Sequence, residues 1–292
     1  MRITIFYITL ITLSIFSLEI YSQNIFNNKK KKEVVKVDEF TKKIKGCEIF
    51  NGLFNIYQNN KDGKAYIEID TSHLDKEFIY FSYFENGVLE AGSVKGRFRG
   101  SKIIKINKFY ENIDITIENT KYFFEEENPL YKAAKTNINT PIIISEKIIA
   151  KDGSKTKFLI NADNLFLTEA FQQVKSSYYP GYKGYRLGNL SKTKTRYSKI
   201  RNYPKNTDIV VNYVYESKYP TKSGSSAMTD ARSVSVIVQH SLIQLPKNNY
   251  KPRVDDPRVG FFTTQSDNMT TTNRVNYRDF INRWNLVKKD ST

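Results

Sequence analysis

The chain has 292 residues, a formal net charge of +16 and one cysteine, Cys47. One cysteine excludes an internal disulfide, so packing alone must hold the fold together. A basic chain can bind nucleic acid, an anionic surface or acidic substrates. Lysine outnumbers arginine by 34 to 12, whereas proteins that read nucleic-acid sequence rely on arginine for base contacts. We therefore expect no nucleic-acid partner.

The N-terminus predicts an export signal. Arg2 precedes the apolar run Ile3–Phe16, and the small residue Ser22 follows as a cleavage position. The alternative is a membrane anchor, but the run is shorter than the roughly 20 apolar residues that a spanning helix needs. We expect residues 1–22 to be removed, leaving an exported protein (periplasmic, on the cell surface or secreted) with no stable membrane insertion.

A Lys-rich lead over 23–45 contains a short predicted helix behind Asp38, and strand patterns begin after Gly52. Alternation of apolar and polar residues, or β-branched and aromatic runs, predicts the strands. The dipeptides Asn86-Gly87 and Asp152-Gly153 predict tight hairpin turns, and a polar loop is expected over Ser217–Ala231. The predicted strands cover 66–70, 78–84, 103–106, 113–117, 141–150, 156–160, 209–215 and 234–242.

Helical spacing is found in three places. A short helix is predicted from Asn128-Pro129 to about Lys135, a longer one over Asp163–Val174, and a third over Tyr277–Trp284, where a strand starting at Trp284 is the alternative. The predicted fold is mainly β, an antiparallel hairpin-rich sheet or sandwich with a few short helices. The predicted organisation is a signal peptide (1–22), the lead (23–45), a small domain (46–92) and a larger β-rich domain (93–288).

Several short motifs occur along the chain in a characteristic order and spacing. They are Gly52–Phe54, Asp62–Ile69, Leu74–Phe78, Gly96-Arg97, Phe158–Glu169, Arg201–Asn206, Ser233–Pro246, Pro252–Phe262 and Tyr277–Leu286. Together they resemble the N-terminal region of the exported bacterial zinc-dependent metalloproteases, in which a non-catalytic pair of domains of unknown function precedes a metzincin-like domain with the motif HExxHxxGxxH. The departures from that family are a Tyr/Lys/Gly-rich insertion around Tyr178–Tyr197 and the missing catalytic half.

The resemblance implies a truncated protease, whose N-terminal region packs on or restrains a catalytic domain absent from this chain, in cis or in trans. Zinc hydrolysis needs three protein ligands and a general base, and this chain has two histidines, His73 and His240, and no HExxH. We expect no catalytic and no metal-binding residues here, and zinc only in the missing domain. His240 is predicted to be a hydrogen-bonded core residue and His73 to lie in a turn.

A candidate domain-docking element lies near the C-terminus. Charges alternate between Pro252 and Pro257, so they could bind a cation or a neighbouring domain, or pair with each other across a rigid turn. We favour pairing, with the turn setting how the next domain docks. The predicted docking residues are Arg253, Asp255, Asp256, Arg258 and Trp284.

A second candidate is the Tyr/Lys-rich loop, which interleaves rings with cations as far as Arg201. Such a loop could stack on sugars or bases or contact an acidic polymer, or it could be a surface insertion. The first reading gives an alternative function, a stand-alone exported binding module. Its candidate ligand residues are Tyr178, Tyr179, Tyr182, Tyr185 and Arg186. Cys47 could coordinate a zinc ion and hold a protease latent, but a lone cysteine is more commonly a small, buried apolar side chain.

Overall fold

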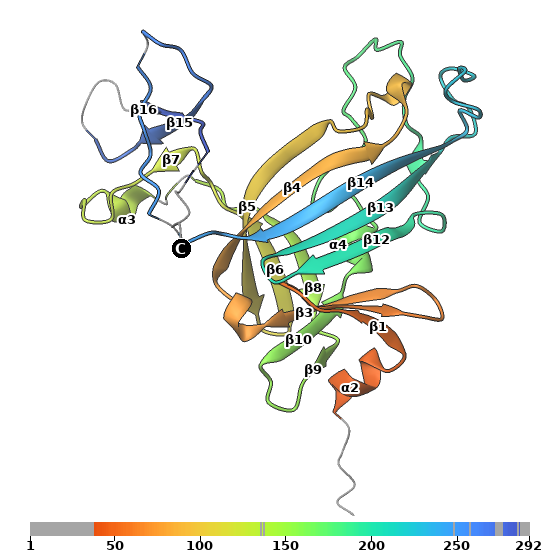
Figure 1. Ribbon diagram of the computed structural model, residues 1–292, viewed down its shortest axis with the longest axis horizontal. Helices are drawn as coiled ribbons and strands as arrows, with labels where there is room; N and C mark the ends of the chain where they lie inside the picture. Colours follow the sequence, from red (N-terminus) through yellow and green to blue (C-terminus); the bar gives the residue numbers. More distant parts are fainter. Residues whose placement is uncertain are drawn as a thin grey trace, which may run out of the picture. The chain divides into compact units, whose positions relative to one another are not determined.

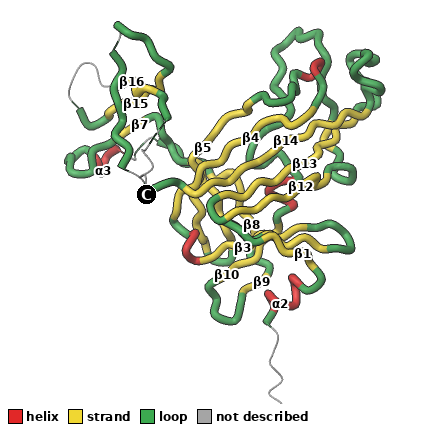
Figure 2. Tube along the Cα trace, viewed as in Figure 1, coloured by secondary structure: helices red, strands yellow, loops and turns green. Residues whose placement is uncertain are grey.

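The computed structural model describes residues 38–134, 136, 138–247, 249–256, 258–271, 277–284 and 286. The predicted signal peptide lies outside these residues. Glu39–Thr292 is one compact unit, and its described part is built mainly of strands, which confirms the predicted fold class (Figures 1 and 2). The helices are α2 (Glu39–Ile44), α3 (Tyr131–Ala134) and α4 (Asp163–Phe166), with single 3-10 turns η1 (Thr71–His73) and η2 (Leu89–Ala91). Within this part of the chain, none of the helices has the length and hydropathy needed to span a bilayer.

An eight-stranded antiparallel sheet, the large sheet, dominates the unit. Its order is β11-β13-β14-β4-β5-β6-β8, and β12 pairs with β13 (Figure 1). The long central strands β13, β14 and β4 lie side by side although β4 is far from the others in sequence. The strands are β4 (Lys76–Asn86), β5 (Phe98–Phe109), β6 (Asn112–Ile117), β8 (Ile142–Lys147), β11 (Asn189–Leu190), β12 (Arg196–Tyr203), β13 (Asn206–Glu216) and β14 (Ser233–Gln244).

Two smaller sheets complete the unit. The small sheet has the order β1-β2-β3-β10-β9, and the three-stranded sheet has the order β16-β15-β7, in which β15 and β7 run parallel. Strands from the predicted small domain (46–92) therefore pair with strands of the predicted larger domain in both the large and the small sheet. The strands are β1 (Cys47–Phe50), β2 (Ile56–Asn59), β3 (Ala65–Asp70), β9 (Ala150–Lys151), β10 (Lys157–Asn161), β7 (Tyr122–Phe123), β15 (Thr263–Asn268) and β16 (Tyr277–Ile281).

The core lies on one face of the large sheet, where period-2 alternation puts every second side chain. In the strands predicted over 209–215 and 234–242, every second residue, counted from Ile209 and from Val234, is buried. The segment from α4 to Val174 packs against this face, with Phe166, Phe171 and Val174 in the same cluster. The buried residues of the two strands are Ile209, Val211, Tyr213, Tyr215, Val234, Val236, Val238, His240 and Leu242.

Two predicted helices are wrong. The helix predicted over Asp163–Val174 stops at Phe166, and the Leu167 amide closes its last turn by donating to the Asp163 carbonyl. Beyond that point the Ala170 and Val174 amides donate to side chains and not to the carbonyls of a continuing helix. The Tyr213 hydroxyl contacts the Phe166 and Thr168 carbonyls, and the Glu169 carboxylate accepts from the Val174 amide. The segment predicted as a helix over Tyr277–Trp284 forms strand β16, paired along its length with β15.

Both predicted hairpins form, but neither closes with a two-residue turn. β9 and β10 pair as far as Lys151 and Phe158, so residues 152–157 connect them, and the Asp152 carboxylate accepts from the Lys157 amide at 2.8 Å. β4 and β5 also pair, but the connection runs through the whole segment 87–97 and includes η2, so Asn86-Gly87 is not a two-residue turn. Gly87 has no positive φ, and a Cβ there would lie 2.5 Å from Ser93.

Candidate functional site

The two histidines occupy structural positions. His240, on β14, is 1% exposed, and both ring nitrogens have tyrosine partners: Nδ1 lies 2.9 Å from the Tyr80 hydroxyl and Nε2 lies 2.8 Å from the Tyr213 hydroxyl. The Tyr213 hydroxyl also lies 2.5 Å from the Phe166 carbonyl, which can only accept a hydrogen bond. Tyr213 therefore donates to Phe166 and accepts from Nε2–H of His240, while Nδ1 accepts from Tyr80. This confirms the predicted core histidine.

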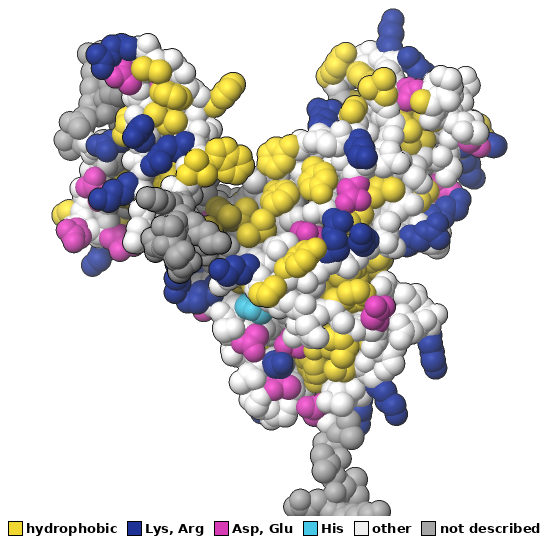
Figure 3. All heavy atoms as spheres, in the orientation of Figure 1, with side chains coloured by type: hydrophobic (Ala, Val, Ile, Leu, Met, Phe, Trp, Pro, Cys, Tyr) yellow, Lys and Arg dark blue, Asp and Glu magenta, His cyan; other side chains and the backbone are white. Residues whose placement is uncertain are grey.

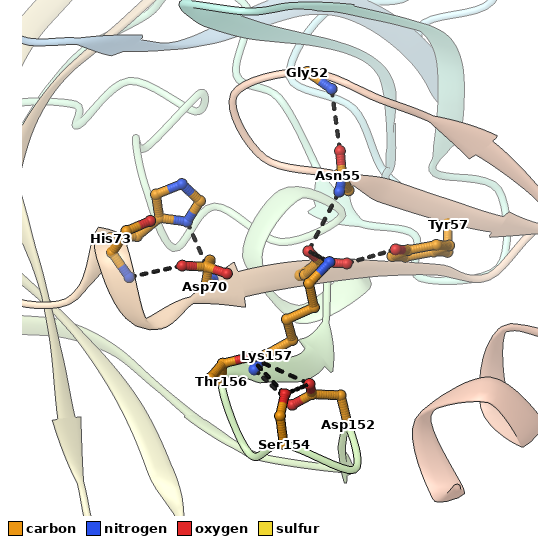
Figure 4. A network of polar contacts seen from close by, with 11 residues as sticks. Gly52, Asn55, Tyr57, Asp70, His73, Asp152, Ser154, Thr156 and Lys157 are labelled. Carbon is orange, nitrogen blue, oxygen red and sulfur yellow. Dashed lines mark hydrogen bonds and ion pairs between the residues drawn. The ribbon is translucent and has the colours of Figure 1, made fainter. Parts of the chain in front are cut away.

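His73 ends the turn η1, as predicted. Its Nδ1 accepts from the Asp70 amide at 3.2 Å, and the Asp70 carboxylate accepts from the Ser72 amide at 2.8 Å, a reciprocal capping box (Figure 4). Burial lowers the pKa of His73. A cavity of about 720 Å³ lies beside the ring, and Lys76, Lys105, Asp75 and Glu77 are among its lining residues, so its charges are mixed.

A buried carboxylate joins three strands of the small sheet. Glu68 is 4% exposed and accepts hydrogen bonds from the Tyr57 hydroxyl at 2.5 Å and the Asn55 amide group at 3.3 Å. The Lys157 ammonium lies 3.0 Å from the same carboxylate (Figure 4). Its hydrogen bond to Glu68 raises the pKa of Lys157. Burial and the hydrogen bond to Glu68 also raise the pKa of Tyr57. The arrangement ties β2, β3 and β10 together.

Replacing Glu68 by Leu should lower the free energy of unfolding by about 1–3 kcal/mol. The substitution leaves the Tyr57 hydroxyl and the Lys157 ammonium without their acceptor, and an unsatisfied buried donor costs about that amount. Urea denaturation followed by circular dichroism measures the difference. Glu48→Leu, at an exposed position on β1, is the matched control. Equal midpoints for the two variants would show that the network adds nothing to stability.

The predicted ligand loop forms an aromatic cluster around a guanidinium. The Tyr178 and Tyr182 rings stack with centroids 4.9 Å apart, and Arg186 lies over both, at 5.4 and 5.8 Å. Arg186 also donates to the Tyr182 carbonyl at 2.7 Å, while its Nε is buried without a hydrogen-bond partner among the described groups. The Tyr179 ring meets Tyr182 edge-on and is 67% exposed.

The fifth candidate residue of that loop is not with the other four. Tyr185 is 2% exposed and donates from its hydroxyl to the Ala231 carbonyl at 2.8 Å, so its ring belongs to the core. A cavity of about 200 Å³ lies beside the rest of the cluster, between Tyr178, Tyr179 and Tyr182 on one side and Arg97 on the other. The loop thus has rings, a cation and a small cavity, which can hold a flat or anionic group.

The predicted docking element runs along the three-stranded sheet. The segment before Asp256 continues that sheet beyond β16: Val254 bridges Phe280, and the Asp255 amide donates to the Asp279 carbonyl at 2.7 Å. One ion pair forms here among the described residues, between Asp256 and Arg258, and it lowers the pKa of Asp256. The position of Pro257 lies outside the described residues.

The other docking residues differ in what they contact. Arg253 contributes its carbonyl, which accepts from the Ile281 amide at 2.9 Å, and Asp255 Oδ1 is buried without a hydrogen-bond partner among the described groups. The Trp284 side chain is 84% exposed. Large apolar side chains on the same segments are also exposed, and no sequence pattern predicted their exposure. They are Val254, Val259, Phe261, Phe262, Trp284 and Leu286.

Hydrogen bonds hold these exposed segments together. The Asn282 amide donates to the Phe262 carbonyl at 2.8 Å, and the Arg283 guanidinium donates to the Lys251 carbonyl at 2.8 Å. The same guanidinium lies 4.5 Å from the centroid of the Tyr250 ring. We call Val254, Val259, Phe261, Phe262, Trp284 and Leu286 the C-terminal apolar surface. Within the described residues, no group of three His, Cys, Asp or Glu side chains is arranged to hold a metal ion.

Comparison with known families gives two matches. A model described as Domain of unknown function (DUF5117) matches residues 96–289, more than half of the chain, and one described as Domain of unknown function (DUF5118) matches residues 37–87. No curated protein and no solved structure matches the chain. Neither description assigns an activity.

Proposed function

Because the chain belongs to the family described as Domain of unknown function (DUF5117), a family without an assigned activity, we propose a role from its motifs and its surface. It acts as the non-catalytic N-terminal region of an exported zinc-dependent metalloprotease. It packs on or restrains a catalytic domain that supplies the zinc and that these 292 residues do not contain. The partner is engaged in cis or in trans, through the C-terminal apolar surface.

The exposure of that surface is the observation that carries the proposal. Phe262 is 89% exposed, Leu286 87% and Trp284 84%, and several large apolar side chains held on joined segments are typical of a surface that binds another protein. Trp is among the residues that most often anchor interfaces. The motif resemblance supports a protease domain as the binding partner. The docking residues lie in segments that resemble those directly preceding the catalytic domain in the metalloprotease family.

Binding to a catalytic domain tests the proposal directly. We expect the purified chain to bind the HExxH-containing domain of such a metalloprotease supplied in trans, measured by isothermal titration calorimetry. Phe262→Ser combined with Trp284→Ser should weaken binding at least thirty-fold, since an anchor residue contributes about 2 kcal/mol or more. Phe109→Ser, at another exposed phenylalanine on β5, is the matched control.

Two results would contradict this function. One is zinc-dependent proteolysis by the purified chain alone, because the proposed role is non-catalytic. The other is binding that Phe262→Ser with Trp284→Ser leaves as tight as Phe109→Ser does, because the C-terminal apolar surface would then not be the contact.

A stand-alone binding module that uses the Tyr/Lys-rich loop is the second candidate. The exposed Tyr179 ring and the cavity beside it favour this role. Deleting Tyr178–Lys199 would not test it, because that segment contains the buried Tyr185 and Leu187 and part of β12. Single substitutions of exposed side chains are needed.

A further inference from the structure

Three loops meet at one end of the large sheet and hold each other in place. They are 87–97, 175–188 and 217–231, and we call them the loop platform. Ser225 donates from its hydroxyl to Glu90, the Arg186 amide donates to the Thr221 hydroxyl at 3.2 Å, and the Thr221 hydroxyl donates to the Gly184 carbonyl at 3.2 Å. The platform is therefore a single surface and not three independent loops.

The platform exposes apolar side chains that no part of the described chain covers. Tyr219 is 91% exposed, Leu89 74%, Tyr179 67% and Val94 45%. Figure 3 shows yellow and dark blue side chains together at the upper right end of the face in view, above β4 and β14. Protruding Leu and Val side chains among cations are typical of a surface that dips into the interface of a lipid bilayer.

The platform is also strongly basic. Its three loops carry seven lysines and arginines and two carboxylates, Glu90 and Asp230. The Arg232 guanidinium already pairs with Asp230, so the cations of the loops are in excess. An anionic surface attracts such a cluster, each lysine or arginine adding to the attraction. The cations of the three loops are Lys95, Arg97, Lys175, Lys183, Arg186, Lys218 and Lys222.

A small cavity opens between two of the loops. It has a volume of about 200 Å³ and is lined by Arg97, Ser176 and Ser177 together with the tyrosines of the aromatic cluster. Pockets for drug-sized ligands measure roughly 300–1,000 Å³, so this cavity suits a single headgroup of a larger assembly. A guanidinium and two hydroxyls are the donors that a phosphate group accepts from.

We propose that the loop platform binds the surface of a membrane that contains anionic phospholipids. Arg97, Ser176 and Ser177 hold a headgroup phosphate, Leu89 and Val94 enter the interface, and the surrounding lysines face the anionic surface. An acidic polysaccharide could bind the same cations, but it has no apolar region in which Leu89 and Val94 could be buried. The proposal names a ligand for the second candidate function and does not depend on docking of a catalytic domain.

Sedimentation with vesicles tests the proposal on the whole chain. We expect binding to vesicles of phosphatidylcholine that contain phosphatidylglycerol, weakening as salt is added, and none to phosphatidylcholine alone. Lys95→Gln, Lys183→Gln and Lys222→Gln together should weaken binding about a hundred-fold, about five-fold for each cation. Leu89→Ser should weaken it about ten-fold, because its apolar area would no longer be buried in the interface.

Matched control variants distinguish vesicle binding by the loop platform from nonspecific attraction due to the net positive charge of the chain. Lys42→Gln, Lys43→Gln and Lys45→Gln remove the same charge at exposed positions in and beside α2, and Leu130→Ser removes another exposed leucine. Both should bind within about two-fold of the parent, and circular dichroism checks that each variant is folded.

Four results would overturn the proposal: no binding to anionic vesicles, equal binding to neutral vesicles, equal losses in platform and control variants, or binding only to polygalacturonate with Leu89→Ser unaffected. Phe262→Ser with Trp284→Ser should leave vesicle binding unchanged, so a failure of catalytic-domain docking is distinguishable.

Discussion

Between pH 6.5 and pH 3 the free energy of unfolding should fall by roughly 1.4 kcal/mol for each pH unit because of one side chain, His240. Burial lowers the pKa of His240 from its ordinary 6.5 to about 3. In this window the unfolded chain binds a proton that the folded chain cannot, so the unfolded state gains stability as the pH falls. Above pH 6.5 both states are neutral at this residue and its contribution is complete.

The surroundings of His240 explain why this residue stays neutral in the folded chain. Its ring contacts the Tyr80 and Tyr213 hydroxyls and the Phe166 ring, none of which is an anion. Protonation would put a hydrogen on Nδ1, which now accepts from Tyr80, and would place a charge in the core. An isolated buried charge is costly unless it is paired.

Urea unfolding at several pH values measures the slope. His240→Gln removes one titrating group and should reduce the slope between pH 6.5 and 4 by roughly 1.4 kcal/mol for each pH unit, although the variant is less stable at pH 7. His73, whose pKa burial also lowers, contributes equally to the slope of both proteins. Acidic groups that titrate lower, such as Asp70, whose pKa is lowered by hydrogen bonds from Ser72, affect both proteins equally. A parent and a His240→Gln protein with parallel curves would show that His240 does not cause the acid sensitivity.

Tyr213→Phe should lower the free energy of unfolding by about 2–4 kcal/mol. Removing the hydroxyl leaves the Phe166 carbonyl and Nε2–H of His240 without their partner, and each unsatisfied buried group costs about 1–3 kcal/mol. Ring packing is retained, so the loss measures the polar contacts. The expected loss is large because Tyr213 is fully buried.

Denaturant titration at pH 7 checks the Tyr213 prediction. Tyr203→Phe, which removes a hydroxyl from a half-exposed ring on β12, is the matched control and should change stability by no more than about 0.5 kcal/mol. A Tyr213→Phe protein as stable as Tyr203→Phe would mean that another group, such as a water molecule, replaces the hydroxyl at no cost.

Alternation predicted the large sheet well because it reports directly on burial. The core-facing residues of β13 and β14, including His240, lie at a period of two. Some residues of the opposite face, such as Val210 and Val214, are buried as well. Helical spacing was a weaker guide. Leu167, Ala170 and Val174 are spaced as on a helix, yet they pack against the core from an irregular segment. Two tyrosines of β13 bind this segment, Tyr213 at the Thr168 carbonyl and Tyr215 at the Glu169 carboxylate. Such long-range partners cannot be read from neighbouring residues.

The candidate sites, too, depend on long-range contacts that the local sequence does not reveal. A run of tyrosines predicts rings near one another, but it does not predict that Tyr185 is buried in the core while Tyr179 is exposed. The cavity beside them needs Arg97 and Gly92 from a loop far away in sequence. In the docking element, the alternating charges predicted pairing across the turn, and one ion pair, Asp256–Arg258, forms among the described residues. The exposed apolar side chains around it follow from how the segment after Gln244 is placed, which no local pattern encodes.

Strand β4 sits between two neighbours that are synthesised at very different times. β5 follows β4 directly in the chain, whereas β14 is synthesised only after most of the chain. In the small sheet, β3 likewise lacks its neighbour β10 until that strand has been synthesised. Until then each has an open edge of amides and carbonyls that can pair with another chain. Non-local pairing of this kind is slow, so the emerging chain depends on protection from aggregation until its central sheet closes.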